Sequence, residues 1–300
     1  MYTTMERVLI YNDYPCHYEI IESVIVKHRE ILNIEHETSI HLYTRPDPSF
    51  KEYVSTKYPK IKFEKTPRAI FDYYINCTVY DHDVNRLDTT KDSNHKYISH
   101  RVTEQLKTNP NVYFLTPLSI NKHLSMDVLP YAANKAVADV PIYIIQGNLN
   151  QNRRHLDLLK KILDETYQYK FIVKLIGRGV LPPSLHEYKD KIVVRNNLNF
   201  IDYHKEFVDG YCILPLISKS SHPGYYATTL TSTINYARGY GLKCLIDKDL
   251  QDIYNLDDVE VFNDINDISS AFKKTLETYY NNSKPVVYRG EYEWTPPWVG

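Results

Sequence analysis

Residues 211–247 read YCILPLISKSSHPGYYATTLTSTINYARGYGLKCLID. The apolar run over 211–217 predicts a buried parallel strand, and a loop of Ser, Lys, His, Pro and Gly follows it. Thr231, Ser232 and Thr233 then open an amphipathic segment that predicts a helix, and KCLID returns to strand character. This order of strand, loop, capped helix and strand is typical of a parallel βαβ unit.

The start of the predicted helix at Thr231 is a candidate anion site. Hydroxyl side chains at a helix start satisfy backbone N–H groups that have no partner within the helix, and the positive end of the helix dipole lies there. A phosphate is therefore expected to bind at Thr231. On this stretch alone, an ordinary crossover helix with a good N-cap remains an alternative.

The composition restricts the class of protein. The chain has 300 residues, 43% of them hydrophobic, which is enough for one large core or two of ordinary size. Because 36 Lys and Arg are balanced by 37 Asp and Glu without a basic block, a general nucleic-acid or membrane-surface binder is disfavoured. We therefore expect no nucleic-acid partner.

Cysteine spacing and hydropathy indicate the compartment. Cys16, Cys77, Cys212 and Cys244 are far apart, each in or beside an apolar run, so we expect reduced core thiols. The apolar run among the first residues is too short for a secretory signal. No later run reaches the ~18 apolar residues of a membrane span. The expected protein is cytoplasmic and has no integral membrane segment.

The first part of the chain alternates strands with helices. The pattern predicts strands at 7–11, 39–45, 73–81, 96–100 and 111–118, a further strand beginning at 61, and helices at 18–32, 50–57 and 102–107. Strands that alternate with helices form a parallel sheet covered on both faces. Apolar runs weaken over 119–139, where we expect the domain boundary.

A second series restarts the same alternation. It predicts strands at 142–146 and 211–217, further strands beginning at 170, 191 and 259, and helices at 154–163, 203–207 and 265–280. The expected fold class is α/β, with two Rossmann-like doubly wound domains facing a cleft. We expect an N-terminal domain over 1–130, a C-terminal domain over 131–282, and a tail, 283–300, that packs back on the first domain. Ligands of such sheets bind outside the carboxyl ends of the strands.

Two turns of the second domain could hold a diphosphate. Gly147 begins the turn GNLNQNRR, and Arg153 and Arg154 end it at the start of a helix, where cations suit a bound anion. The alternative is that these are surface arginines lying over a helix. The next strand ends in LIGRG, where Gly177, Arg178 and Gly179 would allow close approach of backbone to the same ligand.

These motifs, with SHPGYY and TSTINYARGYGLKCLID, resemble the donor-binding half of GT-B glycosyltransferases of the family 4 or group 1 type, over about 141–247. In that family the basic turn binds the diphosphate of a nucleotide-sugar. The resemblance implies this role for Arg153 and Arg154. It also implies Gly224 and Tyr225 near the sugar, and a nucleotide site formed by Thr231, Ser232 and Thr233.

The chain departs from the family pattern at three positions. The family places two glutamates eight positions apart, whereas this sequence has Pro223 and Thr231 there. Retention of anomeric configuration therefore does not carry over. The basic residue that often follows the turn glycine is Asn148 here, which leaves the diphosphate to Arg153, Arg154 and the helix start.

A general base for an inverting transfer should follow a strand of the first domain. The candidates are Asp13 and His17 after the first strand, Asp81 and His82 after the fourth, and His100 after KYIS. Asp13 is preferred because the loop after the first strand is a common acceptor-side position in GT-B enzymes. Taken singly, each candidate fits a helix cap or a solvated loop residue better than a base. The twelve histidines form no close pairs, so no metal site is expected.

The sequence therefore predicts a metal-independent hexosyl- or pentosyltransferase of glycan biosynthesis. Its donor would be a nucleotide-diphosphate-sugar of the UDP or GDP type, its acceptor a hydroxyl of a glycan or glycoconjugate, and no other cofactor is expected. Two alternatives remain open, a non-catalytic nucleotide- or glycan-binding protein on the same scaffold and a nucleotide-sugar epimerase. A DNA glucosyltransferase is disfavoured by the near-neutral charge.

Overall fold

The computed structural model describes residues 5–118, 124, 129, 138–150 and 153–281. The chain divides into two compact units, one formed by 1–129 with 223–235 and the other by 130–222 with 236–300. The segment 223–235 thus belongs to the first unit, although the strand and helix pattern placed it within an uninterrupted second domain. The predicted tail, 283–300, lies outside the described residues.

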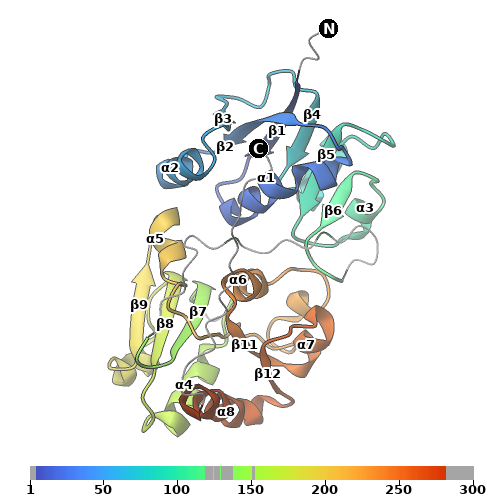
Figure 1. Cartoon of the computed structure of the whole chain (residues 1–300). Coiled ribbons are helices and arrows are strands. Elements are labelled where there is room, and N and C mark those ends of the chain that lie inside the picture. The colour runs from blue at the N-terminus through green and yellow to red at the C-terminus, as the bar shows by residue number, and fades with distance from the viewer. Residues whose placement is uncertain (1–4, 119–123, 125–128, 130–137, 151–152, 282–300) are drawn as a thin grey trace. The chain divides into compact units, whose positions relative to one another are not determined.

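The first unit is built on a six-stranded sheet in the order β3-β2-β1-β4-β5-β6, and its strand pairs are parallel (Figure 1). Its elements are β1 (Glu6–Asn12), α1 (Tyr18–Leu32), β2 (Thr38–Thr44), α2 (Pro48–Lys57), β3 (Lys62–Phe63), β4 (Tyr73–Asn76), the 3₁₀ segment η1 (Asp81–Arg86), β5 (His95–Ser99), α3 (Glu104–Lys107) and β6 (Val112–Phe114). This strand order is that of a dinucleotide-binding Rossmann sheet.

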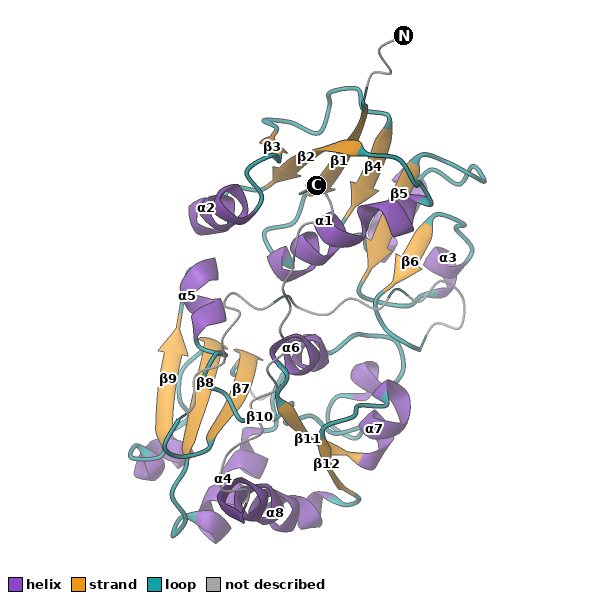
Figure 2. Cartoon of the chain, viewed as in Figure 1, coloured by secondary structure: helices purple, strands orange, loops and turns teal. Residues whose placement is uncertain are grey.

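The second unit repeats the arrangement with a six-stranded parallel sheet in the order β12-β11-β10-β7-β8-β9. Its strands are β7 (Ile142–Asn148), β8 (Ile172–Arg178), β9 (Ile192–Asn196), β10 (Cys212–Ile213), β11 (Lys243–Asp247) and β12 (Val259–Phe262). Its helices are α4 (Leu156–Thr166), α5 (Phe200–Lys205), α7 (Lys248–Tyr254) and α8 (Ile268–Asn281), with η2 (Pro183–Tyr188) and η4 (Ile265–Asp267). Figure 2 shows α4 and α8 side by side. The two predicted α/β domains with parallel sheets are confirmed.

The segment that connects β10 to β11 contains η3 (Pro223–Tyr226) and α6 (Ser232–Tyr240). The helix predicted after Thr231 is therefore confirmed. Gly241 follows α6 with φ of +58°, a left-handed conformation that ends helices and that glycine adopts without strain. The loop and the helix thus form where the pattern predicted them.

Helix α1 shows how local sequence decides an element. Apolar side chains recur with helical spacing along 18–32 and are buried, at Ile20, Ile21, Val24, Ile25, Ile31 and Leu32. Asn33 ends the helix in the left-handed conformation with φ of 57°, and its N–H donates to the Glu30 carbonyl. The predicted bounds of this helix are therefore confirmed.

The apolar run at 211–217 is mostly not strand. Only Cys212 and Ile213 pair in the sheet as β10, while Leu216 turns the chain with φ of 46°. Leu216 is nevertheless only 4% exposed. The run is therefore apolar because it is buried in the core, even where it does not pair in the sheet. Apolar character reports burial and cannot by itself report pairing.

Helix α7 was not predicted, although its start carries a signal. The Asp247 side chain accepts a hydrogen bond of 3.0 Å from the Leu250 N–H, as an N-cap does, and Asn255 ends the helix with φ of 46°. The predicted strand ends at the same Asp247, so strand and helix meet without a loop. The helix is fixed by the burial of Leu250 and Tyr254, which the sequence pattern did not indicate.

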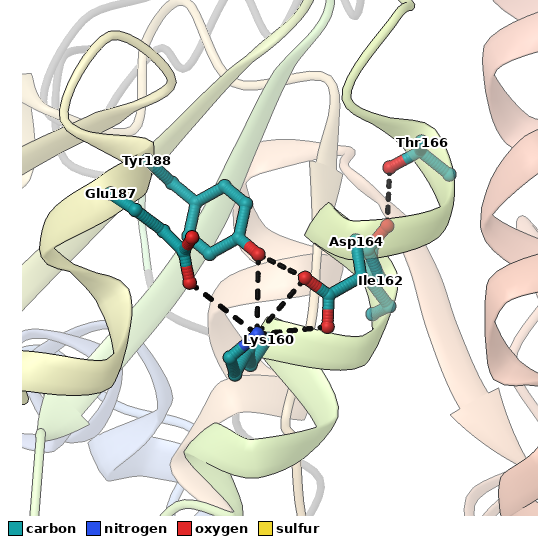
Figure 3. A network of polar contacts seen from close by, with 6 residues as sticks. All are labelled: Lys160, Ile162, Asp164, Thr166, Glu187 and Tyr188. Atoms are coloured by element: carbon teal, nitrogen blue, oxygen red, sulfur yellow. Dashed lines mark hydrogen bonds and ion pairs between the residues drawn. The ribbon is translucent and has the colours of Figure 1, made fainter.

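A polar network fastens α4 to η2 on the surface of the second unit (Figure 3). Lys160 Nζ lies 3.0 Å from both carboxylate oxygens of Asp164, 3.3 Å from Tyr188 Oη and 3.4 Å from Glu187 Oε1. The Tyr188 hydroxyl also donates to Asp164. Exposed ion pairs of this kind contribute little individually, so the network fixes η2 beside α4 more than it stabilises the fold.

The four cysteines form no disulfide with one another. Cys77, Cys212 and Cys244 are fully buried, as expected of core thiols. Cys16 is partly exposed, which corrects the expectation for this residue. The reason is that Cys16 follows β1 in a loop, outside the apolar layer. Among the described residues, no helix is both long and apolar enough to cross a membrane.

Gly177 offers a test of the sheet of the second unit. A Cβ at Gly177 would lie 1.8 Å from the Gly147 carbonyl oxygen, and its φ of +152° is one that other residues rarely adopt. We expect Gly177→Ala to lower the free energy of unfolding by at least about 2 kcal/mol. Gly224→Ala is the matched control, because its Cβ would meet nothing closer than 3.6 Å. Equal denaturation midpoints for the two variants would contradict this account.

Candidate active site

Four of the predicted bases gather at one edge of the first sheet. Asp13 and His17 follow β1, Asp81 follows β4, and His100 follows β5. Since β4 lies between β1 and β5, the carboxyl ends of these strands are neighbours. The chain reverses its winding between β1 and β4, and open parallel sheets bind ligands at such a point.

His17 and His100 pack ring against ring. Their ring centroids are 3.7 Å apart, with the planes inclined by 30°. His17 Nδ1 lies 3.5 Å from Glu19 Oε1, and His17 Nε2 lies 3.4 Å from Tyr80 Oη. His17 precedes α1 with φ of 63°, a conformation that is uncommon for residues other than glycine and that recurs at functional sites.

The two histidines differ in charge, because their pKa values are shifted in opposite directions. Burial lowers the pKa of His17, but hydrogen bonds with Cys16 and Glu19 outweigh burial and raise this pKa to about 10. Burial and the neighbouring His17 cation hold the pKa of His100 well below its ordinary value. Near pH 7, His17 is therefore protonated and has no lone pair for a proton, whereas His100 is neutral and only weakly basic. Neither is well suited as the general base.

Tyrosine and histidine side chains connect the loops after β1 and β4. Tyr14 Oη lies 2.7 Å from His82 Nε2 and donates to Asp83 Oδ2 at 3.1 Å. The same Asp83 oxygen accepts from the Tyr80 N–H at 2.9 Å, and the Tyr14 and Tyr80 rings meet edge to face. Asp83 is thus occupied in holding the two loops together.

Asp13 is the carboxylate of this edge with a shifted pKa. Asp13 lies at the surface with part of the residue covered, and its backbone carbonyl oxygen accepts from Arg45 Nε at 2.6 Å. Partial burial raises the pKa of Asp13, Arg45 opposes this shift, and Asp83 adds to it. Asp81 is also exposed, and its side chain has no hydrogen bond or ion pair in the described part of the chain. We therefore prefer Asp13 as the candidate general base.

The segment 223–235 reaches the same edge through its backbone. The Val102 N–H donates to the Thr228 carbonyl at 2.7 Å, and the Leu230 N–H donates to the His100 carbonyl at 3.0 Å. Between them, Arg101 and Thr229 form an antiparallel bridge. Gly224, Tyr225, Thr231, Ser232 and Thr233, the residues predicted at the sugar and nucleotide, therefore lie in the unit that contains His100.

The remaining predicted donor residues, Gly147, Asn148, Arg153, Arg154, Gly177 and Arg178, lie in the second unit. A diphosphate held between the GNLNQNRR turn and Thr231 would join residues of both units, so that arrangement stays a prediction. Within the second unit, Asn148 and Arg178 are paired at the carboxyl ends of β7 and β8, and both are exposed. They present an amide and a guanidinium at one sheet edge.

The two arginines of the turn differ in environment. Arg154 is 5% exposed, its Nε donates to the Gln146 carbonyl at 3.0 Å, and its Nη1 donates to the Arg153 carbonyl at 2.6 Å. Its guanidinium also occupies the space beside Gly147, where a Cβ would lie 2.7 Å from Nη2. Arg153 is exposed. Arg154 therefore braces the turn, and Arg153 is the more exposed arginine of the two.

The glycines at the carboxyl ends of β7 and β8 have structural explanations. The room beside Gly177 is occupied by the Gly147 carbonyl, and a Cβ at Gly179 would come within 3.0 Å of the Leu149 side chain. All three glycines have positive φ. In this structure they allow neighbouring chain segments, rather than a ligand, to approach closely.

A hydroxyl-rich loop after β10 was not among the predicted site residues. Ser221 Oγ lies 2.6 Å from Ser218 Oγ and 2.7 Å from His222 Nδ1, and the His222 N–H donates to the Ser218 carbonyl at 2.7 Å. The loop follows the strand beside β7, at the point where the second sheet reverses its winding. The signal was present in the sequence, since SKSSH comes directly after the apolar run.

The architecture is similar to that of solved glycosyltransferases. A glycosyltransferase from Rickettsia africae ESF-5 has a TM-score of 0.55 at 10% identity, with 92% of this chain and 89% of that chain covered. AviGT4, a glycosyltransferase involved in avilamycin A biosynthesis, has a TM-score of 0.55 at 10% identity, with 92% and 96% covered. Sucrose-phosphate synthase (tll1590) from Thermosynechococcus elongatus has a TM-score of 0.53 at 9% identity, with 91% and 90% covered.

These similarities establish the fold. The chain has the two-domain GT-B fold that its motifs led us to expect. No protein-family model matches the sequence, and no curated protein sequence is significantly similar to it.

Proposed function

We propose that the protein is a glycosyltransferase that moves a sugar from a nucleotide-diphosphate-sugar to an acceptor hydroxyl of a glycan or glycoconjugate. The observation that carries the proposal is the exposed Asp13, with its raised pKa, at the winding reversal of a GT-B fold. Glycosyl transfer by the structurally similar proteins supports it by analogy of fold.

In the proposed reaction the acceptor oxygen attacks the anomeric carbon of the donor. The new glycosidic bond forms as the bond between that carbon and the diphosphate oxygen breaks. Asp13 takes the proton of the acceptor hydroxyl, and the diphosphate leaves with the electron pair of the broken bond. The outcome is inversion at the anomeric carbon.

Donor binding is assigned to the carboxyl edge of the second sheet. The exposed guanidinium groups of Arg153 and Arg178 would neutralise the diphosphate, and the Ser218 and Ser221 hydroxyls would donate hydrogen bonds to it. In this arrangement side chains, and no metal ion, neutralise the negative charge of the diphosphate. UDP and GDP are the nucleotides to test first.

The test is thermal unfolding with nucleoside diphosphates. A ligand at one hundred times its dissociation constant adds about 2.7 kcal/mol of stability, so UDP or GDP should raise the melting temperature measurably. We expect Arg153→Ala to weaken this binding by about 1.5–3 kcal/mol with little effect on the free protein, because the side chain is exposed.

Arg154→Ala is the companion variant. We expect it to lower the stability of the free protein, since it removes hydrogen bonds to the Gln146 and Arg153 carbonyls. The earlier expectation treated both arginines alike, and the structure now separates them. No thermal shift with any nucleotide would contradict the proposed donor. Nucleotide binding without sugar transfer would favour the non-catalytic alternative.

A further inference from the structure

Two buried polar atoms at the carboxyl ends of β4 and β5 have no hydrogen-bond partner among the described residues. They are the hydroxyl oxygen of Thr78 and Nε2 of His100. Thr78 is 0% exposed and His100 is 8% exposed. One backbone group of each residue is bonded, because the Thr78 N–H donates to Asn76 Oδ1 and the His100 carbonyl accepts from the Leu230 N–H. The missing partners are those of the two side chains.

The bonding of His100 decides which chemistry its free nitrogen offers. Its ring makes a hydrogen bond with the Cys77 backbone that favours the protonated ring, as a bond to a carbonyl does. Since Nε2 has no partner, Nδ1 makes this bond and carries the proton of the neutral ring. His100 Nε2 then holds a lone pair, which needs a hydrogen-bond donor. The Cys77 carbonyl belongs to the peptide unit that leads into Thr78, so the His100 ring meets the backbone directly before Thr78.

Leaving both groups unpaired is costly to the free protein. A buried polar atom without a hydrogen bond loses its water and gains nothing in exchange, and native structures contain few such atoms. Thr78 and His100 lie at the sheet edge where a ligand is expected, and the His100 ring packs against the ring of protonated His17. The His17 cation disfavours a cationic ligand, while the lone pair of His100 requires an O–H or N–H donor. A neutral alcohol meets both conditions.

We propose that Thr78 and His100 form a hydroxyl-binding pair of the acceptor site, with His100 Nε2 accepting from one ligand hydroxyl and Thr78 bonding the same or a neighbouring one. The inference rests on the proposed function for its ligand, a polyhydroxylated sugar. His100 then positions the acceptor, while Asp13 takes the proton of the attacking acceptor hydroxyl. Both atoms are covered in this structure, so the ligand reaches them after a local movement. The segment at Thr228–Leu230 is adjacent to His100 and is held by backbone hydrogen bonds to His100 and Val102.

The first arm of the test is stability without a ligand. Thr78→Val keeps the shape of the side chain and removes the unpaired hydroxyl, so we expect the melting temperature of the free protein to rise by roughly 2–4 °C. Ser99→Ala is the matched control on the neighbouring strand, because the buried Ser99 hydroxyl donates to the Val79 and Arg101 carbonyls. The control should lower the melting temperature. A fall with Thr78→Val would show that its hydroxyl is satisfied within the fold and would overturn the inference.

The second arm is binding, observed at the His100 ring by ¹⁵N NMR. The probes are the methyl glycosides of the common hexoses and heptoses, with inorganic phosphate as the anionic comparison. At least one glycoside should shift the His100 Nε2 resonance. Thr78→Val should lower the affinity for that glycoside about 10-fold, and Thr78→Ser should restore the affinity. A shift with phosphate alone, or with no probe, would overturn the inference.

The outcomes separate this inference from the proposed function. If nucleotides bind and sugar is transferred while Thr78→Val leaves glycoside binding unchanged, the hydroxyl-binding pair is wrong and the transferase stands. If a glycoside shifts the His100 resonance but no nucleotide binds, the pair stands and the transferase is wrong.

Discussion

Replacing Asp13 by Asn is expected to lower the rate of sugar transfer by about 10²–10⁴-fold, the usual contribution of a positioned general base. Asparagine keeps the shape of the side chain and a hydrogen-bonding group but takes up no proton. Donor binding is assigned to the second unit, so nucleoside diphosphate affinity should stay nearly unchanged. The measurements are turnover with a nucleotide-sugar and thermal unfolding with the nucleotide.

The pH dependence follows from the direction of the pKa shift. Asp13 acts as a base only when ionised, and partial burial and Asp83 raise its pKa above the ordinary 3.8 although Arg45 opposes them. Turnover should therefore be full above the raised pKa and fall as the pH drops through it. Replacing Arg45 by Met removes the opposing cation, so the acid limb should move to higher pH.

Asp81→Asn is the matched control for this prediction. Asp81 is an exposed carboxylate at the same sheet edge, and we expect turnover close to wild type. Near wild-type turnover in Asp13→Asn with loss in Asp81→Asn would reverse the assignment. A product that retains the anomeric configuration of the donor would remove the need for a base on the acceptor side.

The second large effect is expected on stability, at Glu22. The Glu22 carboxylate is 2% exposed on α1 and accepts from Tyr53 Oη at 2.7 Å and from Tyr58 Oη at 2.7 Å. Lys57 Nζ lies 2.6 Å from the same carboxylate. Removing one partner of a buried ion pair typically costs 3–5 kcal/mol, so Glu22→Ala should lower the free energy of unfolding by about this amount. Denaturant unfolding measures it.

Glu30→Gln controls for a charge change on the same helix. Glu30 is exposed on α1. Surface substitutions of this kind usually change the free energy of unfolding by no more than about 0.5 kcal/mol. If Glu22→Ala behaved like this control, the buried network would add nothing to stability. A loss of stability in both variants would instead implicate the helix itself.

Several elements were predictable because local sequence decides them. Helix α1 has apolar residues at helical spacing and a left-handed Asn33 at its end, so its bounds follow from periodicity and capping. The candidates Asp13, His17 and His100 were predictable for a related reason. In a parallel sheet the residues after each strand share one edge, so the strand pattern alone brings them together.

The separate roles of similar residues were not predictable. Arg153 and Arg154 are neighbours in the sequence, yet one is exposed and the other braces the Gln146 carbonyl. His17 and His100 are both histidines after strands, yet one is a cation and the other is neutral. Burial and neighbouring charge decide these differences, and both depend on side chains that are distant in the sequence.

The sequence by itself determined two series of strands and helices, the parallel sheets they form, and the edge at which polar residues collect. Tertiary structure alone decided that 223–235 joins the first unit, because two backbone hydrogen bonds link Thr228 and Leu230 to residues more than a hundred positions away. It also left the Thr78 hydroxyl and His100 Nε2 unpaired. Periodicity reports which face of an element is buried, whereas hydrogen bonds across the fold depend on positions that only packing brings together.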